Sequence, residues 1–222
     1  MKQLSPGVNS NLRCTNFGAP PDTPSQPLAP GWRAKEYWQG NFINIPGAGQ
    51  QEVLRRDSAV NTNVPDDGQA TPLVTTGLWA IRCLGSLAST GSATPVKDQG
   101  EGFLAISPDG TRYRFDWLVS RTAGGMSKQA SIAGAHVSME RVDVRIFPTL
   151  ITDRFGNTVS YTFDTTDKWK LLSIQSSDGR SLSFTYEPGS RRIKTVSDRC
   201  AIRILMGSNV PGLEATPNVR SI

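Results

Sequence analysis

One short pattern constrains the fold of this sequence more than any other feature, because it occurs three times in the same register. Each copy begins at a glycine turn and continues with alternating apolar and polar residues. The copies read DGTRYRFDW from residue 109, FGNTVSYTF from residue 155 and DGRSLSFTY from residue 178. The third, fifth and seventh residues after each glycine are large and apolar: Tyr113, Phe115, Trp117, Val159, Tyr161, Phe163, Leu182, Phe184 and Tyr186. A glycine turn followed by period-2 alternation predicts β-hairpin arms that bury one face.

Each copy also contains an aspartate in or next to its turn. The turn residues are Asp109 and Gly110, Asp153 and Gly156, and Asp178 and Gly179. Aspartate side chains accept hydrogen bonds from backbone amides two residues further on, so these carboxylates are predicted to be structural. The second and third glycines lie only 23 residues apart by their numbers. A unit of that size cannot cover its own apolar face, so the hairpins must stack on neighbours.

The remaining sequence favours an all-β fold. The chain holds 21 Gly and 15 Pro in 222 residues and only 19% charged residues, as is typical of many short strands joined by turns. Further strands are predicted near 42–45, 78–84, 103–106 and 142–146. The segment 119–139, rich in Gly, Ala and Ser, is predicted to be a long loop or a short helix.

These elements suggest four regions. Residues 1–31 contain six prolines and are predicted to form an extended Pro-rich leader or linker. Residues 32–140 form a β-rich lead-in, residues 141–198 carry the repeats, and residues 199–222 form an irregular tail outside the repeat register. Residues 1–30 contain no apolar run typical of a signal peptide, and no stretch is apolar enough to predict a membrane span.

Charge and cysteine content argue against several classes of site. The net charge is +5, but residues 1–167 are balanced and the excess is spread over residues 168–222, so no nucleic-acid partner is predicted. Cys14, Cys83 and Cys200 are widely separated and form no CxxC pair, which supports neither a disulfide framework nor a zinc site. Cys83 and Cys200 are predicted to be buried apolar residues. No metal and no other cofactor is expected.

Catalytic motifs are equally scarce. The single histidine, His136, lies among small residues and is predicted to be solvated, and the sequence contains neither GxSxG nor a P-loop. Paired carboxylates for glycoside hydrolysis remain an open alternative, since their separation in space decides the matter. The candidate carboxylates are Glu101, Asp109, Asp116, Glu140 and Asp143. We predict no catalytic residue, and therefore a protein that is not an enzyme.

Five aromatic residues outside the repeat register leave a second alternative. They are Trp32, Tyr37, Trp38, Trp79 and Trp169. A surface cluster of two or three of them would indicate a carbohydrate platform, and hence a carbohydrate-binding or adhesion module. Packing into the core is the default interpretation for aromatic side chains.

Taken together, the repeat segments resemble the Rhs/YD-repeat family of bacteria. The similar segments are SPDGTRYRFDW, PTLITDRFGNTVSYTF and SSDGRSLSFTYEPGSRRIKTVSD, and PGWRAKEYWQGNFINIPG and GEGFLAISPDG resemble the family's lead-in. The characteristic Tyr-Asp is present only as Phe163-Asp164, and Tyr186 is followed by Glu187. The resemblance covers residues 30–198.

This resemblance implies a β-sheet that spirals into a hollow shell, which encloses a toxin domain or displays a surface for contact with other cells. It also implies a secreted or cell-surface location. The expected partners are a toxin domain or further repeats of a longer protein, and a cell-surface glycan or receptor. Because the chain is far shorter than a closed shell, we expect a non-enzymatic structural segment, a fragment or truncated product.

Overall fold

The computed structural model describes residues 2–3, 13–25, 30–45, 49–57, 65, 67–88, 100–130, 135–199 and 219–221. Within these residues the chain is almost entirely β-strand, with one short helix, α1 (Ala34–Tyr37). The strands are β1 (Lys2–Gln3), β2 (Phe42–Ile45), β3 (Gly49–Arg55), β4 (Leu73–Thr75), β5 (Ala80–Leu84), β6 (Gly102–Ile106), β7 (Arg112–Gln129), β8 (His136–Thr152), β9 (Thr158–Phe163), β10 (Leu171–Ser176), β11 (Ser181–Tyr186), β12 (Ile193–Arg199) and β13 (Val219–Ser221). The all-β prediction is confirmed. No helix among the described residues is long and apolar enough to cross a membrane.

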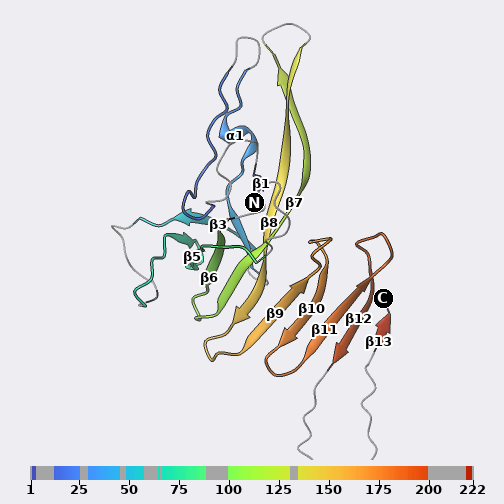
Figure 1. Cartoon of the computed structure of the whole chain (residues 1–222). Helices are drawn as coiled ribbons and strands as arrows, with labels where there is room; N and C mark the ends of the chain where they lie inside the picture. Colours follow the sequence, from blue (N-terminus) through green and yellow to red (C-terminus); the bar gives the residue numbers. More distant parts are fainter. Residues whose placement is uncertain are drawn as a thin grey trace, which may run out of the picture.

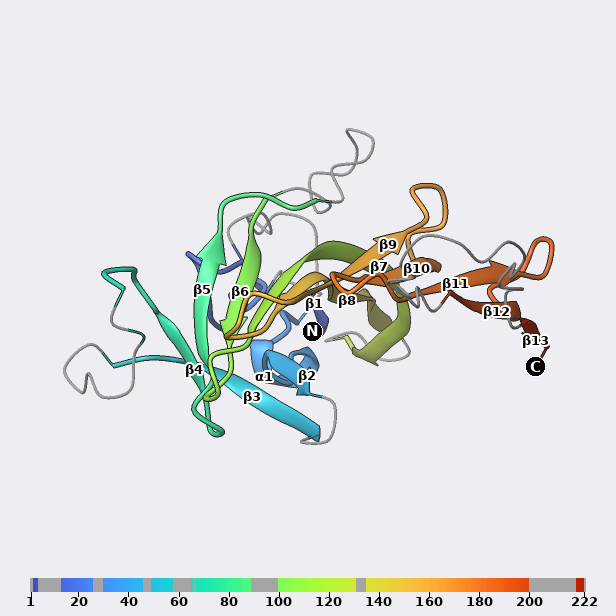
Figure 2. The ribbon, with the colours of Figure 1, turned by 90° about the horizontal axis from the view of Figure 1, so that it is seen from below.

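All the described strands belong to one open sheet. Strands β2 to β13 follow one another in chain order, each antiparallel to the next, while β1 pairs with β8. Figure 1 shows β9 to β12 side by side below the long β7–β8 hairpin. Seen at right angles in Figure 2, the sheet is strongly twisted, with β3 to β6 at one end and β10 to β12 at the other. An open antiparallel sheet twists in this way because each strand has a right-handed twist.

The predicted strands at 42–45, 103–106 and 142–146 and in the repeats are present. Strand β5 begins two residues later than the prediction of 78–84, because Leu78 has a positive φ of 61° in a turn. Strands β10 and β12, which contain leucine or isoleucine, follow the second and third repeat arms. The border predicted between residues 140 and 141 falls inside β8.

The prediction of a loop or short helix at 119–139 is wrong. Strands β7 and β8 continue through most of this segment and pair as far as Gln129 opposite His136. The glycines are accommodated by a shift of register between Thr122 and Gly125, where Gly124 has a φ of +72°. Glycine adopts this conformation without the steric cost of a Cβ atom, so the pair causes a bulge and does not end the strand.

The upper part of this hairpin is supported by residues 30–38. Trp32 and Tyr37 are buried and pack with Trp38 against Met126 and Met139, one from each strand of the hairpin. Figure 1 shows this segment and α1 running alongside β7 and β8. Cross-strand pairing and apolar contact together therefore explain why a Gly/Ala/Ser-rich sequence forms a long hairpin here.

The main core lies between the N-terminal segment and β2 to β7. It consists of Cys14, Phe17, Ile43, Ile45, Val53, Leu73, Trp79, Ile81 and Ala105, each at most 9% exposed. Cys14 and Phe17 of the proline-rich region thus contribute to the core, although the sequence there lacks any strand pattern. We call residues 13–25 the strap, since they lie in a non-strand conformation across the sheet.

A disulfide bond between Cys14 and Cys83 ties the strap to β5, with a Cα–Cα distance of 5.3 Å. The sequence-based argument against disulfides is therefore wrong for this pair, and Cys83 is exposed, not a buried apolar residue. The cause of the error is distance along the chain, because the two cysteines are 69 residues apart and only folding brings them together. Cys200 and most of the predicted tail lie outside the described residues.

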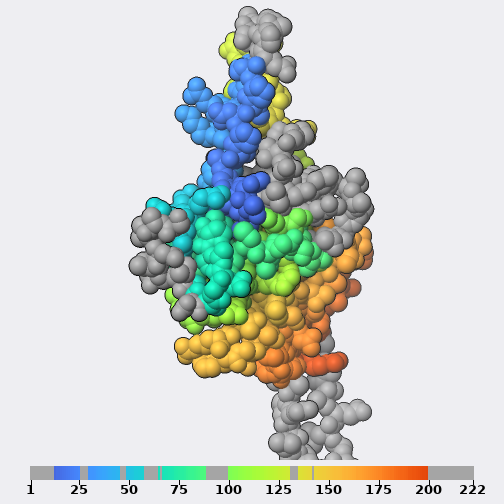
Figure 3. Space-filling view, turned by 60° about the vertical axis from the view of Figure 1, so that its left-hand side comes forward, coloured from blue at the N-terminus to red at the C-terminus, as the bar shows by residue number. Residues whose placement is uncertain are grey.

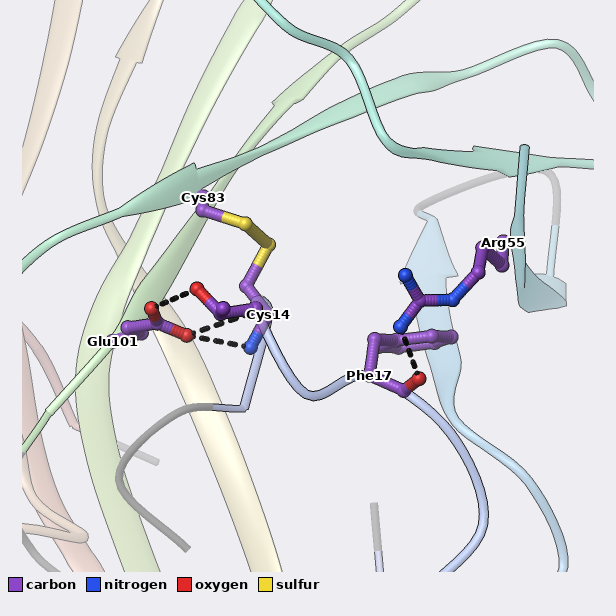
Figure 4. The surroundings of a disulfide bond; sticks show 6 residues. Cys14, Phe17, Arg55, Cys83 and Glu101 are labelled. Atoms are coloured by element: carbon purple, nitrogen blue, oxygen red, sulfur yellow. Dashed lines mark hydrogen bonds between the residues drawn. A yellow bond between two sulfur atoms is a disulfide. The ribbon is translucent and has the colours of Figure 1, made fainter. Parts of the chain in front are cut away.

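Polar contacts fix the strap next to this disulfide. The Glu101 carboxylate accepts hydrogen bonds from the backbone N–H groups of Cys14 and Thr15, both at 2.9 Å, and from the Thr15 hydroxyl. Arg55 donates to the Phe17 carbonyl at 2.7 Å. Figure 4 shows both contacts flanking the Cys14–Cys83 bond. These hydrogen bonds hold the Glu101 carboxylate against the strap, and the residue is only 8% exposed to solvent.

Candidate functional site

The apolar positions of the second and third repeat arms lie on one face of the sheet. In the antiparallel register, Ile174 of β10 lies opposite both Tyr161 of β9 and Leu182 of β11. Phe184 lies opposite Val196, and Tyr186 lies opposite Ile193. Directly opposite residues point to the same side of a sheet. We define the aromatic face by these side chains together with their strand neighbours: Val159, Tyr161, Phe163, Ile174, Leu182, Phe184, Tyr186, Ile193 and Val196.

The reverse side of the same strands is polar. Serine and threonine occupy the alternating positions, and they pair across the strands as Ser173 with Thr162 and with Ser183. The hydroxyls of Thr185 and Thr195 are hydrogen-bonded to each other across β11 and β12. Such side chains face water at little cost. The two sides of β9 to β12 therefore differ sharply in polarity.

The aromatic face is only partly covered by the described residues. Leu182 is 37% exposed and Ile193 is 41% exposed, and the aromatic rings of β9 and β11 are half-buried. In the first repeat arm, by contrast, Trp117 is only 8% exposed. Figure 2 shows β10 to β12 extending away from the strands that carry the core. An apolar sheet face is normally packed against a second layer.

Four aromatic side chains join the β7–β8 hairpin to the repeats, and we call them the aromatic junction. The rings of Trp117 and Phe147 stack on Phe163 with centroid distances of 5.2 and 5.7 Å, and Phe147 meets Trp169 edge-on at 5.9 Å. Trp117 Nε1 donates to the Lys168 carbonyl at 2.8 Å. Pairs of this kind stabilise by about 0.5–1.5 kcal/mol beyond their buried area. The junction therefore holds the repeat strands in a defined position.

Two arginine guanidinium groups lie next to the ring of Trp169 in this junction. Arg121 lies 5.3 Å and Arg191 5.8 Å from the centroid of Trp169. Arg191 also pairs with Asp167 at 2.9 Å, and this hydrogen bond lowers the pKa of the Asp167 carboxyl. These contacts occupy the faces of Trp169 with side chains of the protein itself.

The predicted turn residues lie at the hairpin turns and act on the backbone. Asp153 Oδ1 accepts hydrogen bonds from the N–H groups of Phe155 and Asn157 at 2.8 and 2.9 Å. Asp109 and Asp178 each accept from the N–H group two residues further on, at 3.1 Å. The turn glycines Gly110, Gly156 and Gly179 have φ values of +89°, +89° and +88°.

These hydrogen bonds favour the ionised carboxylates. The pKa of Asp178 is lowered to about 2, chiefly by the Arg180 side chain and then by the Arg180 backbone N–H. The Ser107 hydroxyl is the main cause that lowers the pKa of Asp109, and the Asn157 side chain is the main cause for Asp153. A carboxylate that caps a turn in this way serves structure.

The other carboxylates considered for glycoside hydrolysis are engaged in structural contacts or exposed. Asp116 is 1% exposed, pairs with Arg114 at 2.5 Å and accepts from the Thr149 hydroxyl. Glu101 is held by the strap, and Glu140 and His136 are exposed on β8. The described residues contain no group of three or more His, Cys, Asp or Glu that could hold a metal ion.

The aromatic residues outside the repeat register do not form the surface cluster that a sugar platform requires. Trp32, Tyr37 and Trp79 are at most 7% exposed. Trp38 packs with the first two against the long hairpin, and Trp169 belongs to the aromatic junction. Tertiary packing therefore distributes these side chains over three places: the contact with the long hairpin, the main core and the aromatic junction.

A separate cleft of about 400 Å³ lies between the β2–β3 hairpin and strands β5 to β8. Its walls include Phe17 of the strap, Phe103 and Phe115, and its polar lining includes Asp143 and Arg145. From the sequence, Asp143 is predicted only as a candidate for a carboxylate pair, and the cleft is not predicted. No local pattern predicts the cleft, since its lining comes from the strap and from β2, β3, β5, β6, β7 and β8.

Comparisons of this chain with protein-family models, with curated proteins and with solved structures found no match.

Proposed function

We propose that the chain is a non-enzymatic structural segment of an Rhs/YD-repeat-like wall, whose aromatic face turns toward a covering polypeptide. The observation that carries the proposal is the two-sided character of β9 to β12. One side carries apolar rings that the described residues cover incompletely, and the other carries serine and threonine. A sheet with these two sides is suited to separate a covered space from water.

The order of the strands supports the same role. Because every strand from β2 to β12 pairs with its neighbour in the sequence, hairpins can be added along the sheet without rearranging those already formed. The aromatic junction and the turn aspartates keep the repeat strands in register. The covering polypeptide that we propose is further repeats of a longer protein or a toxin domain that such a wall encloses.

The disulfide supports a location outside the cytosol. Disulfides persist in oxidising compartments and are rare where thiols are kept reduced. The Cys14–Cys83 bond connects the strap to the core and has one exposed cysteine, which a reducing cytosol would attack. We therefore propose a secreted or cell-surface location.

A photo-crosslinking experiment tests the proposed orientation of the sheet. A photoreactive phenylalanine analogue replaces Leu182 on the aromatic face or, as matched control, Ser183 on the polar face of the same strand. The chain is expressed in its natural host from its own gene. We expect crosslinks from position 182 to peptides encoded by the same gene or an adjacent one, and far fewer from position 183. Equal crosslinking from the two positions, or none from position 182, contradicts the proposal.

The alternative role as a carbohydrate-binding or adhesion module has less support. It requires exposed aromatic side chains, whereas the tryptophans and the tyrosine outside the register pack inside the protein or in the aromatic junction. A glycan or receptor partner would have to use the aromatic face itself. Glycan-array binding that is lost on replacement of Tyr186 would favour that alternative.

A further inference from the structure

The cleft between the β2–β3 hairpin and strands β5 to β8 has the properties of a small-molecule site. Its volume of about 400 Å³ lies within the range of roughly 300–1,000 Å³ found for ligand pockets. Neither the aromatic face nor the turn aspartates of the proposed wall contribute to its lining. The proposed role as a wall therefore does not account for this cleft.

Most of the cleft wall is apolar and rigidly held. Ile81 is 2% and Ala105 0% exposed, and both belong to the main core. Phe103 and Phe115 lie opposite each other on β6 and β7, and both line the cleft. Phe17 closes one side and is held by the neighbouring disulfide and by Arg55. The partly exposed rings of Phe103 and Phe115 offer an apolar surface for a hydrocarbon chain or a ring.

The charged lining of the cleft is the ion pair of Asp143 and Arg145. Asp143, 7% exposed, receives hydrogen bonds from Arg121 Nε and Nη2 at 3.2 and 3.1 Å, and from Arg145 Nη2 at 3.5 Å. Two guanidinium groups thus share one carboxylate. Arg145 is the more distant partner, lines the cleft and has a side chain that is 48% exposed.

We propose that the cleft binds a small amphipathic anion, with its apolar part against the phenylalanine rings and a carboxylate group at Arg145. A guanidinium has five N–H donors in a planar fork that suits a carboxylate, and only one nitrogen of Arg145 contacts Asp143. Asn44, which is exposed, also belongs to the polar lining of the cleft. A cationic ligand is disfavoured because Asp143 already has two cationic partners.

Isothermal titration calorimetry with decanoate, decylamine and decanol, below their micelle concentrations, tests this proposal on the whole chain. The three probes have the same hydrocarbon length and differ only in the head group. We expect decanoate to bind about 10-fold more tightly than decylamine, the effect of a hydrogen-bonded charged head group. Equal affinity for all three probes, or absence of decanoate binding, overturns the proposal.

Three variants locate the binding. Arg145→Gln keeps the side-chain stem and should remove most of the preference for decanoate, and Arg145→Glu should reverse it in favour of decylamine. The matched control Arg154→Gln removes an exposed arginine from the β8–β9 turn and should change nothing. Thermal unfolding by circular dichroism establishes that each variant is folded. An unchanged decanoate preference in folded Arg145→Glu refutes the assignment.

The aromatic face is the competing place for an amphipathic probe. Leu182→Asp places a charge on that face, far along the sheet from the cleft. We expect decanoate affinity to be unchanged in this variant. A loss of decanoate binding in Leu182→Asp, with normal binding in Arg145→Gln, would show that decanoate binds to the aromatic face. That result would refute the cleft proposal.

Discussion

Removal of the Cys14–Cys83 disulfide should destabilise the protein by an amount that the structure allows us to calculate. The bond closes a loop between residues 69 apart in the sequence. The chain-entropy relation for a closed loop of this size gives about 4 kcal/mol at 25 °C. Because the measured effect of a disulfide often falls below the value from this relation, we expect the double variant Cys14→Ser with Cys83→Ser to lose about 3 kcal/mol.

Urea unfolding followed by circular dichroism measures this loss. With a slope of about 2.5 kcal/mol/M for a chain of this size, the urea midpoint should fall by about 1.2 M. Both proteins carry Cys200→Ser, so that no third thiol can exchange with the pair. The unmodified pair treated with a reducing agent should give the same midpoint as the double variant.

Two outcomes of this measurement would contradict the expected loss of stability. The strap keeps its hydrogen bonds to Glu101 and the Arg55–Phe17 contact in both proteins, so the difference reports the crosslink alone. A loss below about 1 kcal/mol would mean that the unfolded chain is not constrained by the bond, against the loop-entropy argument. A midpoint unaffected by the reducing agent would mean that the bond does not form.

Three further predictions concern the repeats. Phe184→Ala should lower the free energy of unfolding in urea by about 2 kcal/mol, less than for a fully buried phenylalanine because the ring is half-buried. The polar-face control Ser183→Ala should change it by no more than about 0.5 kcal/mol. Equal losses of stability in the two variants would show that the two sides of the sheet are not distinct. Gly156→Ala should cost about 1 kcal/mol because φ is +89° while the space for a Cβ atom is open; an unchanged urea midpoint would refute this. The folded pKa of Asp178, about 2, lies below the ordinary value of 3.8, so its contribution to stability is present above pH 4 and is lost as the pH falls toward 2. Asp178→Asn should flatten this part of the pH profile of the urea midpoint, and an identical profile would contradict the assignment.

Local patterns predicted the repeat strands well, for a physical reason. Alternation of apolar and polar residues, and glycine where φ is positive, are properties of a few neighbouring residues. The turn at Asp153 and Gly156 and the alternation of β9 and β11 follow from them directly. The prediction was wrong at Gly124 and Gly125, because pairing with β8 and the contact of Met126 and Met139 with Trp32 and Tyr37 outweighed the low strand propensity of glycine.

The aromatic face and the cleft also differ in how far the sequence predicts them. The aromatic face could be predicted, since its members repeat at fixed spacing, but its exposure could not, since exposure depends on which elements pack against it. The cleft could not be predicted at all. Asp143 and Arg145 are neighbours on β8, but Phe17 and Phe103 reach them only through the curvature of the sheet and the position of the strap.

The sequence by itself determined the class of the fold, the turns and the two-sided strands, because each depends on interactions within a hairpin. Figure 3 shows what only the tertiary structure decided: the N-terminal segment lies against the sheet and packs on residues distant in sequence. The Cys14–Cys83 bond, the burial of Glu101 and the cleft beside Phe17 all depend on that packing. Contacts between residues so far apart have no local pattern, since their free energy is gained only when the whole chain has folded.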